Sequence, residues 1–270
     1  MIIRHKDKNP EIDQTVYIAP NALICGNVTI GKNSRIMFGA QIIAENSSVS
    51  IGDNCIVLEN AVIRGTDGHS VTIGENCLIG PNSHLAGCTL EDNVFIATGA
   101  SIFHGALIKK GAEVRINGVV HIKTVIPENE TVPIGWIAVG NPMKLFSPDK
   151  HNEIWEIQKP LNFPEFVYGL ARKENAESMM SDICKVMYDR LSEHKTDLII
   201  NDKDMNDTKG KMPPNNLPVY RLLTGPDDSK FCERVTEALS MGYKLCGSPA
   251  ATFNGETVIV AQAIIWYAFE

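Results

Sequence analysis

Residues 61–101, AVIRGTDGHSVTIGENCLIGPNSHLAGCTLEDNVFIATGAS, decide the fold because branched aliphatic residues recur in this stretch at a spacing of six. The series extends in both directions, and every interval is six except nine after Ile42, ten after Ile63 and five after Leu85. Neither an α-helix nor an alternating strand has a period of six. The members of the series are Ile18, Ile24, Ile30, Ile36, Ile42, Ile51, Val57, Ile63, Ile73, Ile79, Leu85, Leu90, Ile96, Ile102, Ile108, Val114 and Val120.

A second series, of small or β-branched residues, lies two positions before the aliphatic residues and includes Cys55, Cys77 and Cys88. A short parallel strand and a turn, repeated three times per coil, explains both series, because aliphatic residues then fill the interior and small residues fit the corners. Such hexapeptide helices are a known exception to the right-handed crossover rule. The sequence therefore predicts a mainly β protein, a left-handed parallel β-helix (hexapeptide repeat) followed by helices and a small C-terminal α+β (β-α-β-β) module.

The repeat also predicts where His84 points. It immediately precedes the buried Leu85, and side chains alternate across a strand, so we expect His84 to face outward. Every third repeat falls on the same face of the prism, which places Val62, Phe103 and Val119 on the same wall as His84. Apolar side chains on a wall that faces water are typical of a subunit interface. We therefore expect a homotrimer packed through these faces; a monomer with scattered apolar residues is the alternative.

Composition excludes several classes of function. With 32 acidic and 25 basic residues, the chain lacks the basic surface that nucleic-acid binding needs. No apolar run approaches the roughly 20 residues needed to span a bilayer, and the first residues lack the apolar core of a secretory signal. The seven cysteines contain no CxxC pair, which argues against a structural zinc site of that type and against a disulfide framework. We expect a cytoplasmic protein that binds neither nucleic acid nor membrane.

The rest of the chain divides by pattern. We predict the β-helix over residues 1–148, a helical covering segment over 149–195, a polar linker over 196–216 and the α+β module over 217–270. In the module, Asp227 or Asp228 caps the helix and Asn254-Gly255 forms a hairpin turn.

Residues 12 to about 147 resemble the γ-class carbonic anhydrase branch of the hexapeptide superfamily. The telling stretches are VYIAPNALICGNVTIG (16–31), residues 61–101 and IAVGNPMKL (137–145). The resemblance implies a trimer with a three-histidine metal site between subunits. Position by position, however, the three ligands fall on Arg64, Pro81 and Ala86, and an arginine would put a fixed cation where a dication should sit. The last 52 or so residues resemble a small bacterial domain of unknown function.

Other polar residues gather near the lost ligands. His69 lies in the loop after Arg64, His84 two residues before Ala86, and His104 at the next corner, with Asn82 and Glu59 at nearby turns. Two arrangements stay open. One is a relocated zinc or iron site using His69, His84 and Asn82, and the other is a metal-free acid–base group drawn from His84, His69, Arg64, Glu59 and His104.

We therefore predict a divergent γ-carbonic-anhydrase-like protein, a small-molecule enzyme or binder that acts at the inter-subunit cleft without ordinary CO2 hydration. If it is an enzyme, its chemistry is that of a γ-carbonic-anhydrase-like lyase or hydrolase, or that of an acyltransferase. The first alternative is an acyl-CoA-dependent hexapeptide acyltransferase with His84 or His104 as the base. The second is a catalytically silent trimeric scaffold.

Overall fold

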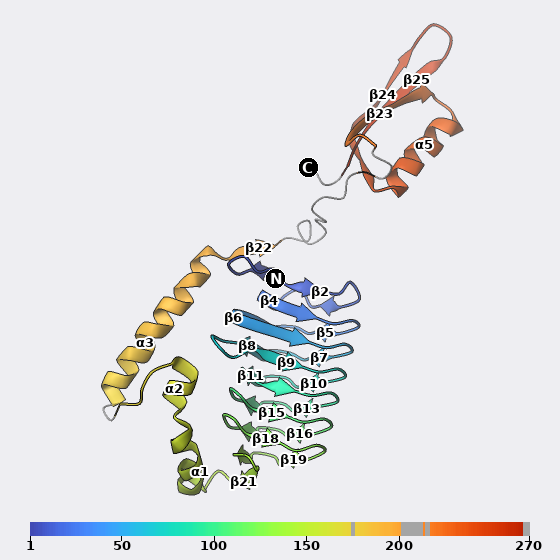
Figure 1. The fold of residues 1–270 in the computed structure, drawn as a ribbon. Helices are drawn as coiled ribbons and strands as arrows, with labels where there is room; N and C mark the ends of the chain where they lie inside the picture. The colour runs from blue at the N-terminus through green and yellow to red at the C-terminus, as the bar shows by residue number, and fades with distance from the viewer. Residues whose placement is uncertain (174–175, 201–212, 214–216, 267–270) are drawn as a thin grey trace. The chain divides into compact units, whose positions relative to one another are not determined.

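The computed structural model describes residues 1–173, 176–200, 213 and 217–266 (Figure 1). The chain separates into two compact units, Met1–Ile200 and Asn201–Glu270. None of the helices in these described ranges is long and apolar enough to cross a membrane.

The first unit is a β-helix whose coils stack in parallel register (Figure 1). One face carries β8 (Val62–Gly65), β11 (His84–Ala86), β14 (Ser101–Ile102), β17 (Val119–Val120) and β20 (Ile137–Val139). A second face carries β2 (Glu11–Ile12), β9 (Val71–Ile73), β12 (Thr89–Leu90), β15 (Leu107–Ile108) and β18 (Val125–Ile126). A third carries β3 (Tyr17–Ile18), β5 (Arg35–Ile36), β7 (Ile56–Val57), β10 (Leu78–Ile79), β13 (Phe95–Ile96), β16 (Glu113–Val114) and β19 (Thr131–Val132). The long strands β4 (Leu23–Ile30) and β6 (Gln41–Ile51) pair with strands of both the first and the second face.

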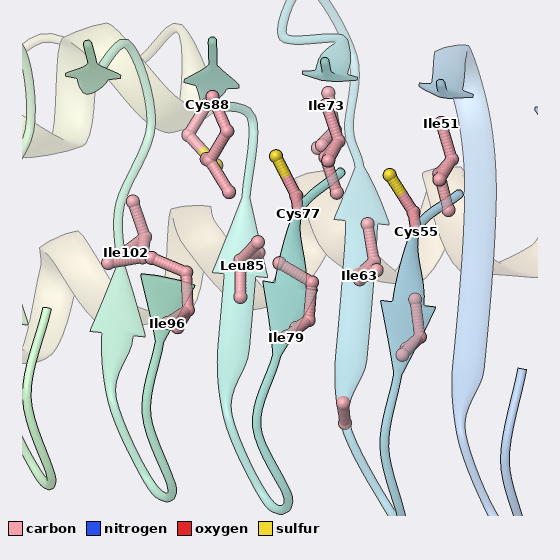
Figure 2. Packing of buried hydrophobic residues seen from close by; sticks show 14 of the residues in the cluster. Ile51, Cys55, Ile63, Ile73, Cys77, Ile79, Leu85, Cys88, Ile96 and Ile102 are labelled. Carbon is pink, nitrogen blue, oxygen red and sulfur yellow. The ribbon is translucent and has the colours of Figure 1, made fainter. Parts of the chain in front are cut away.

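The six-residue series forms the core. Ile42, Ile63, Leu85 and Ile102 are direct register partners on successive coils, and all four are fully buried. Figure 2 shows Ile63, Leu85 and Ile102 stacked along the interior, with the sulfur atoms of Cys55 and Cys77 beside them. The left-handed β-helix predicted from the sequence is confirmed, and Cys55, Cys77 and Cys88 all belong to this core.

Shortening one rung of this core is expected to destabilise the protein strongly. Leu85→Ala leaves a cavity between two fixed neighbours, so the free energy of unfolding should fall by about 2–5 kcal/mol. Denaturant unfolding followed by circular dichroism measures the change. Thr89→Ala, at an exposed position one strand later, is the control and should change it by less than about 0.5 kcal/mol. Equal effects from both variants would contradict the assignment of Leu85 to the core.

Helices cover part of the β-helix (Figure 1). After β21 (Lys144–Phe146), which pairs antiparallel with β20, the chain forms α1 (His151–Gln158), η1 (Lys159–Leu161), α2 (Phe163–Tyr168), α3 (Ala176–Ser192) and η2 (Glu193–Thr196). Asp67 of the β-helix forms an ion pair with Arg190 of α3 (3.4 Å), and Asn46 donates a hydrogen bond to Glu193 of η2 (3.1 Å). The covering segment therefore returns along the solenoid to its N-terminal end.

Residues 198–200 differ from the prediction, which placed them in a linker. They form β22 (Leu198–Ile200), which pairs antiparallel with β1 (Ile2–Arg4). The reason is that Leu198, Ile199 and Ile200 supply a short β-prone run opposite the open edge of β1. Most of the remaining predicted linker, residues 201–216, lies outside the described residues.

The second unit is a three-stranded antiparallel sheet with one helix. The sheet order is β23 (Tyr220–Pro226), β25 (Val258–Trp266), β24 (Tyr243–Phe253), and α5 (Ser229–Ser240) packs on it through Phe231. The side chain of Asp228 caps α5 by accepting a hydrogen bond from the Phe231 amide (2.8 Å). This is the predicted β-α-β-β order.

Candidate functional site

His84 lies on the outer surface of β11, as the repeat predicts. Its register partners are Val62 on β8 and Ser101 on β14, while Leu85 beside it points into the core. The imidazole is half-buried, and no hydrogen bond to it forms among the residues that the structure describes. His84 is thus a partly accessible imidazole whose ring nitrogens are not engaged by the described residues.

Arg64 supplies a fixed positive charge that acts on His84. It lies on β8 opposite Ala86 of β11, so its guanidinium sits on the same wall as His84. A carboxylate oxygen of Glu45 accepts a hydrogen bond from Arg64 Nη2, and Glu45 itself is only 7% exposed. This ion pair orients the guanidinium and uses one of its nitrogens, which leaves other N–H donors for a ligand.

Burial lowers the pKa of His84, and the positive charge of Arg64 lowers it further. Both effects disfavour the imidazolium, the first through lost hydration and the second through repulsion. At neutral pH the His84 ring is therefore uncharged and able to accept a proton.

Three further residues, His69, Thr66 and His104, form a second polar group. His104 is buried, its Nε2 lies 3.2 Å from Thr66 Oγ1, and its Nδ1 has no partner among the described residues. The ring of His69 stands edge-on to that of His104, with centroids 5.2 Å apart. Burial lowers the pKa of His104 to about 4, with smaller contributions from His69, His84 and Arg64.

His69 is held by the covering segment. Its Nε2 donates a hydrogen bond to the carbonyl oxygen of Phe166 in α2 (2.8 Å), and the two rings are 4.6 Å apart. The Nζ of Lys123 lies 3.9 Å from the centroid of the same Phe166 ring. Phe166 is 97 residues from His69 in the chain. No periodicity or motif in the sequence could have indicated this contact.

Asn82 and Glu59 are not brought into this group. Asn82 is exposed and has φ of 55°, which makes it one of a series of asparagines in left-handed turn conformation at the corners of the coils. Within the described residues, no hydrogen bond or ion pair joins the side chain of Glu59 to Arg64 or to the histidines. Its backbone conformation gives Asn82 a role in the turn, and its role as a metal ligand across a subunit interface stays a prediction.

The residues at the family's three ligand positions do not fit a metal. Arg64 is engaged with Glu45, Pro81 has no donor side chain, and Ala86 is buried with only a methyl group to offer. Among the described residues, three or more His, Cys, Asp or Glu ligand atoms converge at one place only, and that place does not include His69, His84 or His104. The site described here is therefore a group of imidazoles beside a guanidinium.

Removing the charge of Arg64 is expected to raise the pKa of His84. Arg64→Gln deletes the repulsion but leaves the burial, so the pKa should rise toward its ordinary value of 6.5 without reaching it. A pH titration of the histidine resonances by NMR measures this shift, with His84→Gln used for assignment. Arg115→Gln, which removes an exposed arginine paired with Glu113, should leave the titration unchanged. An unaltered His84 titration in Arg64→Gln would show that the two groups do not interact.

Comparison with known proteins supports these observations. Residues 70–104 match the family described as bacterial transferase hexapeptide (six repeats), and residues 26–64 match the hexapeptide repeat of succinyl-transferase. Residues 218–266 match a domain of unknown function (DUF1737). These matches place the repeat and the C-terminal unit where the fold has them.

Two curated relatives come from Arabidopsis thaliana. Gamma carbonic anhydrase 2, mitochondrial, is 29% identical over 154 residues, covering 55% of this chain and 53% of the relative. Gamma carbonic anhydrase 1, mitochondrial, is 27% identical over 180 residues, covering 64% of this chain and 63% of the relative. The chain thus spans between about half and two thirds of the length of these relatives.

Among solved structures, a hexapeptide transferase family protein from Anaplasma phagocytophilum is 23% identical, with 67% of this chain and 93% of that chain covered at a TM-score of 0.38. That score is too low to support a functional comparison. The repeat, its two family matches and the sequence relatives agree with each other: the chain is similar to γ-carbonic anhydrases over its hexapeptide repeat and carries a C-terminal domain of unknown function.

Proposed function

We propose that this protein acts on a small anionic molecule by metal-free acid–base chemistry at the wall formed by Arg64 and His84, and that it does not hydrate CO2 as a zinc enzyme does. One observation carries the proposal. The His84 imidazole, which has no hydrogen-bond partner within the part of the chain that the structure describes, shares a wall with the Arg64 guanidinium, where the relatives' family would place metal ligands. The relatives are named carbonic anhydrases, but that activity requires ligands which Arg64, Pro81 and Ala86 do not supply.

Arg64 is suited to bind the anion. A guanidinium presents parallel N–H groups that match a carboxylate or phosphate, and it stays charged at every physiological pH. Glu45 holds the guanidinium in place from the buried side. An anion of about the size of a short carboxylate would then lie next to the His84 ring.

His84 is suited to move the proton. Its pKa is lowered by burial and by Arg64, so the ring is unprotonated when substrate arrives and can act as a general base. A bound anion would partly cancel the charge of Arg64 and raise the pKa of His84, which favours proton uptake in the complex. His104 lies deeper, already contacts Thr66, and is a positioning residue.

A homotrimer completes this proposal. Val62, Phe103 and Val119 are half-buried, apolar, and point outward on the wall that holds His84. Packing a second copy against them would shield the site from bulk water and strengthen its electrostatic interactions. Light scattering during gel filtration tests this directly, with a mass of three chains supporting the trimer and a mass of one chain contradicting it. The cytoplasmic location expected from the sequence stays a prediction, and the Arabidopsis relatives are named mitochondrial.

Titration calorimetry with malonate, succinate and hydrogencarbonate tests the proposal. Arg64→Gln should weaken binding of the best anion by about 10–100-fold, the usual effect of losing a charged hydrogen bond. His84→Gln should change the affinity by only a few-fold, because this residue contributes to proton transfer more than to binding. Arg115→Gln is the matched control for loss of a positive charge. Binding that Arg64→Gln leaves unchanged would refute the role of Arg64.

The two alternatives make separate predictions. An acyltransferase should gain thermal stability from acetyl-CoA or succinyl-CoA, whereas the acid–base site responds to small anions alone. A scaffold should keep its function in cells when Arg64 and His84 are both replaced. Either result would displace the proposal made here.

A further inference from the structure

A second cluster of side chains lies at the N-terminal end of the β-helix, away from His84 and His104. Four residues from two distant parts of the chain meet there. One follows β1, one lies on β4, one is in η2, and one precedes β22. This N-terminal cluster consists of His5, Cys25, His194 and Asp197.

Asp197 is at the centre of the cluster. Its Oδ1 lies 2.6 Å from His5 Nδ1, and its Oδ2 lies 2.7 Å from His194 Nδ1 and 3.8 Å from Cys25 Sγ. The two imidazole rings are 4.4 Å apart. One ligand atom from each of the four residues lies within 4.8 Å of every other.

The cluster is largely shielded from solvent. His5 is 2% exposed and Cys25 3%, while the side chains of Asp197 and His194 are 15% and 28% exposed. The Nε2 of His5 is buried and has no partner among the described residues.

Cys25 differs from the other buried cysteines of this unit. Cys55, Cys77 and Cys88 belong to the prism core, whereas Cys25 does not. It follows the buried Ile24 on β4, and its register partner on the next coil is Ile43, which in turn lies opposite Arg64. Cys25 therefore occupies the outward series of positions, where its sulfur lies 3.8 Å from Asp197, the residue between η2 and β22.

We propose that the N-terminal cluster binds one Zn²⁺ ion, with a sulfur, two nitrogens and a carboxylate oxygen as its four ligands. This set of donors suits zinc, which takes four ligands of these types in a tetrahedron. Zinc bonds of about 2.0–2.3 Å set neighbouring ligand atoms roughly 3.3–3.8 Å apart. The Asp197–histidine distances would thus open by about 0.6 Å or more when the ion replaces the two hydrogen bonds.

The surroundings of the cluster suit a metal. Glu45 Oε1 lies 3.6 Å from His194 Nε2, so a carboxylate faces the ring nitrogen that would not bind the ion, as is common for metal-bound histidines. His5 and Glu45 also line a polar pocket of about 480 Å³, which offers a path for the ion to enter. On binding, the Cys25 thiol would lose its proton to solvent, and the sulfur would bind the ion as thiolate.

The alternative use of this cysteine, as a nucleophile, fits less well. Burial, with smaller contributions from the carboxylates of Asp197 and Glu45, raises the pKa of Cys25 to about 12. Without a cation the thiol stays protonated and unreactive. A divalent ion reverses that preference.

Four protein ligands leave no open position, so the site is structural. The ion would join the turn after β1 to the segment between η2 and β22, which are 192 residues apart at His5 and Asp197. It would thereby fix the return of the covering segment to the first coil. The proposal is independent of the chemistry assigned to Arg64 and His84.

The test uses the full chain, expressed without a polyhistidine tag, stripped with a chelator, reloaded with Zn²⁺ or Co²⁺ and desalted. We expect about one metal ion per chain, a thiolate-to-cobalt charge-transfer band in the near ultraviolet, and a higher Tm with zinc than without. Cys25→Ser and Asp197→Asn should each weaken metal binding by at least about 10–100-fold. The Tm of these variants should no longer respond to zinc.

Two controls separate this site from others. The combined variant Cys184→Ser, Cys232→Ser, Cys246→Ser removes the three cysteines outside the buried set and should keep both the metal and the cobalt band. His84→Gln should also keep the metal, so failure here and failure of the proposed function are distinguishable. Loss of the metal or the band from the three-cysteine variant would contradict the proposal. So would wild-type chain that retains no metal, or Cys25→Ser that binds it as tightly as wild type. If Cys25→Ser fails to fold, the cobalt band of the three-cysteine variant decides.

Discussion

The zinc-loaded protein is expected not to accelerate the hydration of CO2, so the measured rate should equal the rate in buffer alone. Hydration requires a metal-bound hydroxide, which forms at neutral pH because zinc lowers the pKa of its bound water to about 7. That chemistry needs protein ligands plus one open position on the metal. The positions that match the family's ligands hold Arg64, Pro81 and Ala86, and the N-terminal cluster would fill all four positions with side chains.

Stopped-flow measurement of proton release from CO2 and water tests this expectation. The assay compares the metal-stripped chain, the zinc-loaded chain and Cys25→Ser treated with zinc in the same way, over a range of protein concentrations. Equal rates in all three are expected. A zinc-dependent rate that scales with protein concentration would show that the site described at Arg64 and His84 is wrongly interpreted.

Acid is expected to destabilise the protein strongly between pH 6.5 and pH 4, and buried histidines are the main reason. Burial lowers the pKa of His104 and that of His121 to about 4 each, whereas an unfolded histidine titrates near 6.5. Below pH 6.5 the unfolded chain therefore binds more protons than the folded chain, and the free energy of unfolding falls as the pH falls. For His104 alone the loss reaches at most about 3 kcal/mol by pH 4.

Denaturant unfolding at pH 7 and at pH 4.5 measures this loss. His104→Gln should reduce the difference between the two pH values, although it also changes stability at pH 7 by altering the contact with Thr66. His151→Gln, at the exposed start of α1, should leave the difference as it is in wild type. If His104→Gln and wild type lost the same stability in acid, His104 would not be the titrating group.

The β-helix could be predicted because its pattern is local and repeated. Each coil reuses the same constraint, so an aliphatic residue such as Ile63 or Leu85 at period six specifies both its own burial and its register with the next coil. The outward direction of His84 followed from the same rule. The wall that carries His84 and Arg64 was therefore readable from the sequence alone.

The contacts made by the covering segment could not be predicted from the sequence. Phe166 reaches His69 across 97 residues and Asp197 reaches His5 across 192. Such pairings depend on where a helix docks, which no spacing of residues encodes. The one available signal was that Cys25 follows the buried Ile24 and so points outward, unlike Cys55, Cys77 and Cys88. The same limit explains why residues 198–200 were predicted as linker, because a three-residue strand is recognisable only beside its partner β1.

The most direct test of the account is anomalous diffraction at the zinc edge from crystals of the zinc-loaded chain. The central claim is that the wall of Arg64 and His84 works without a metal while the N-terminal cluster holds one. We predict an anomalous peak among His5, Cys25, His194 and Asp197 and none beside Arg64, His69 or His84. A peak beside Arg64 and His84 would contradict that claim.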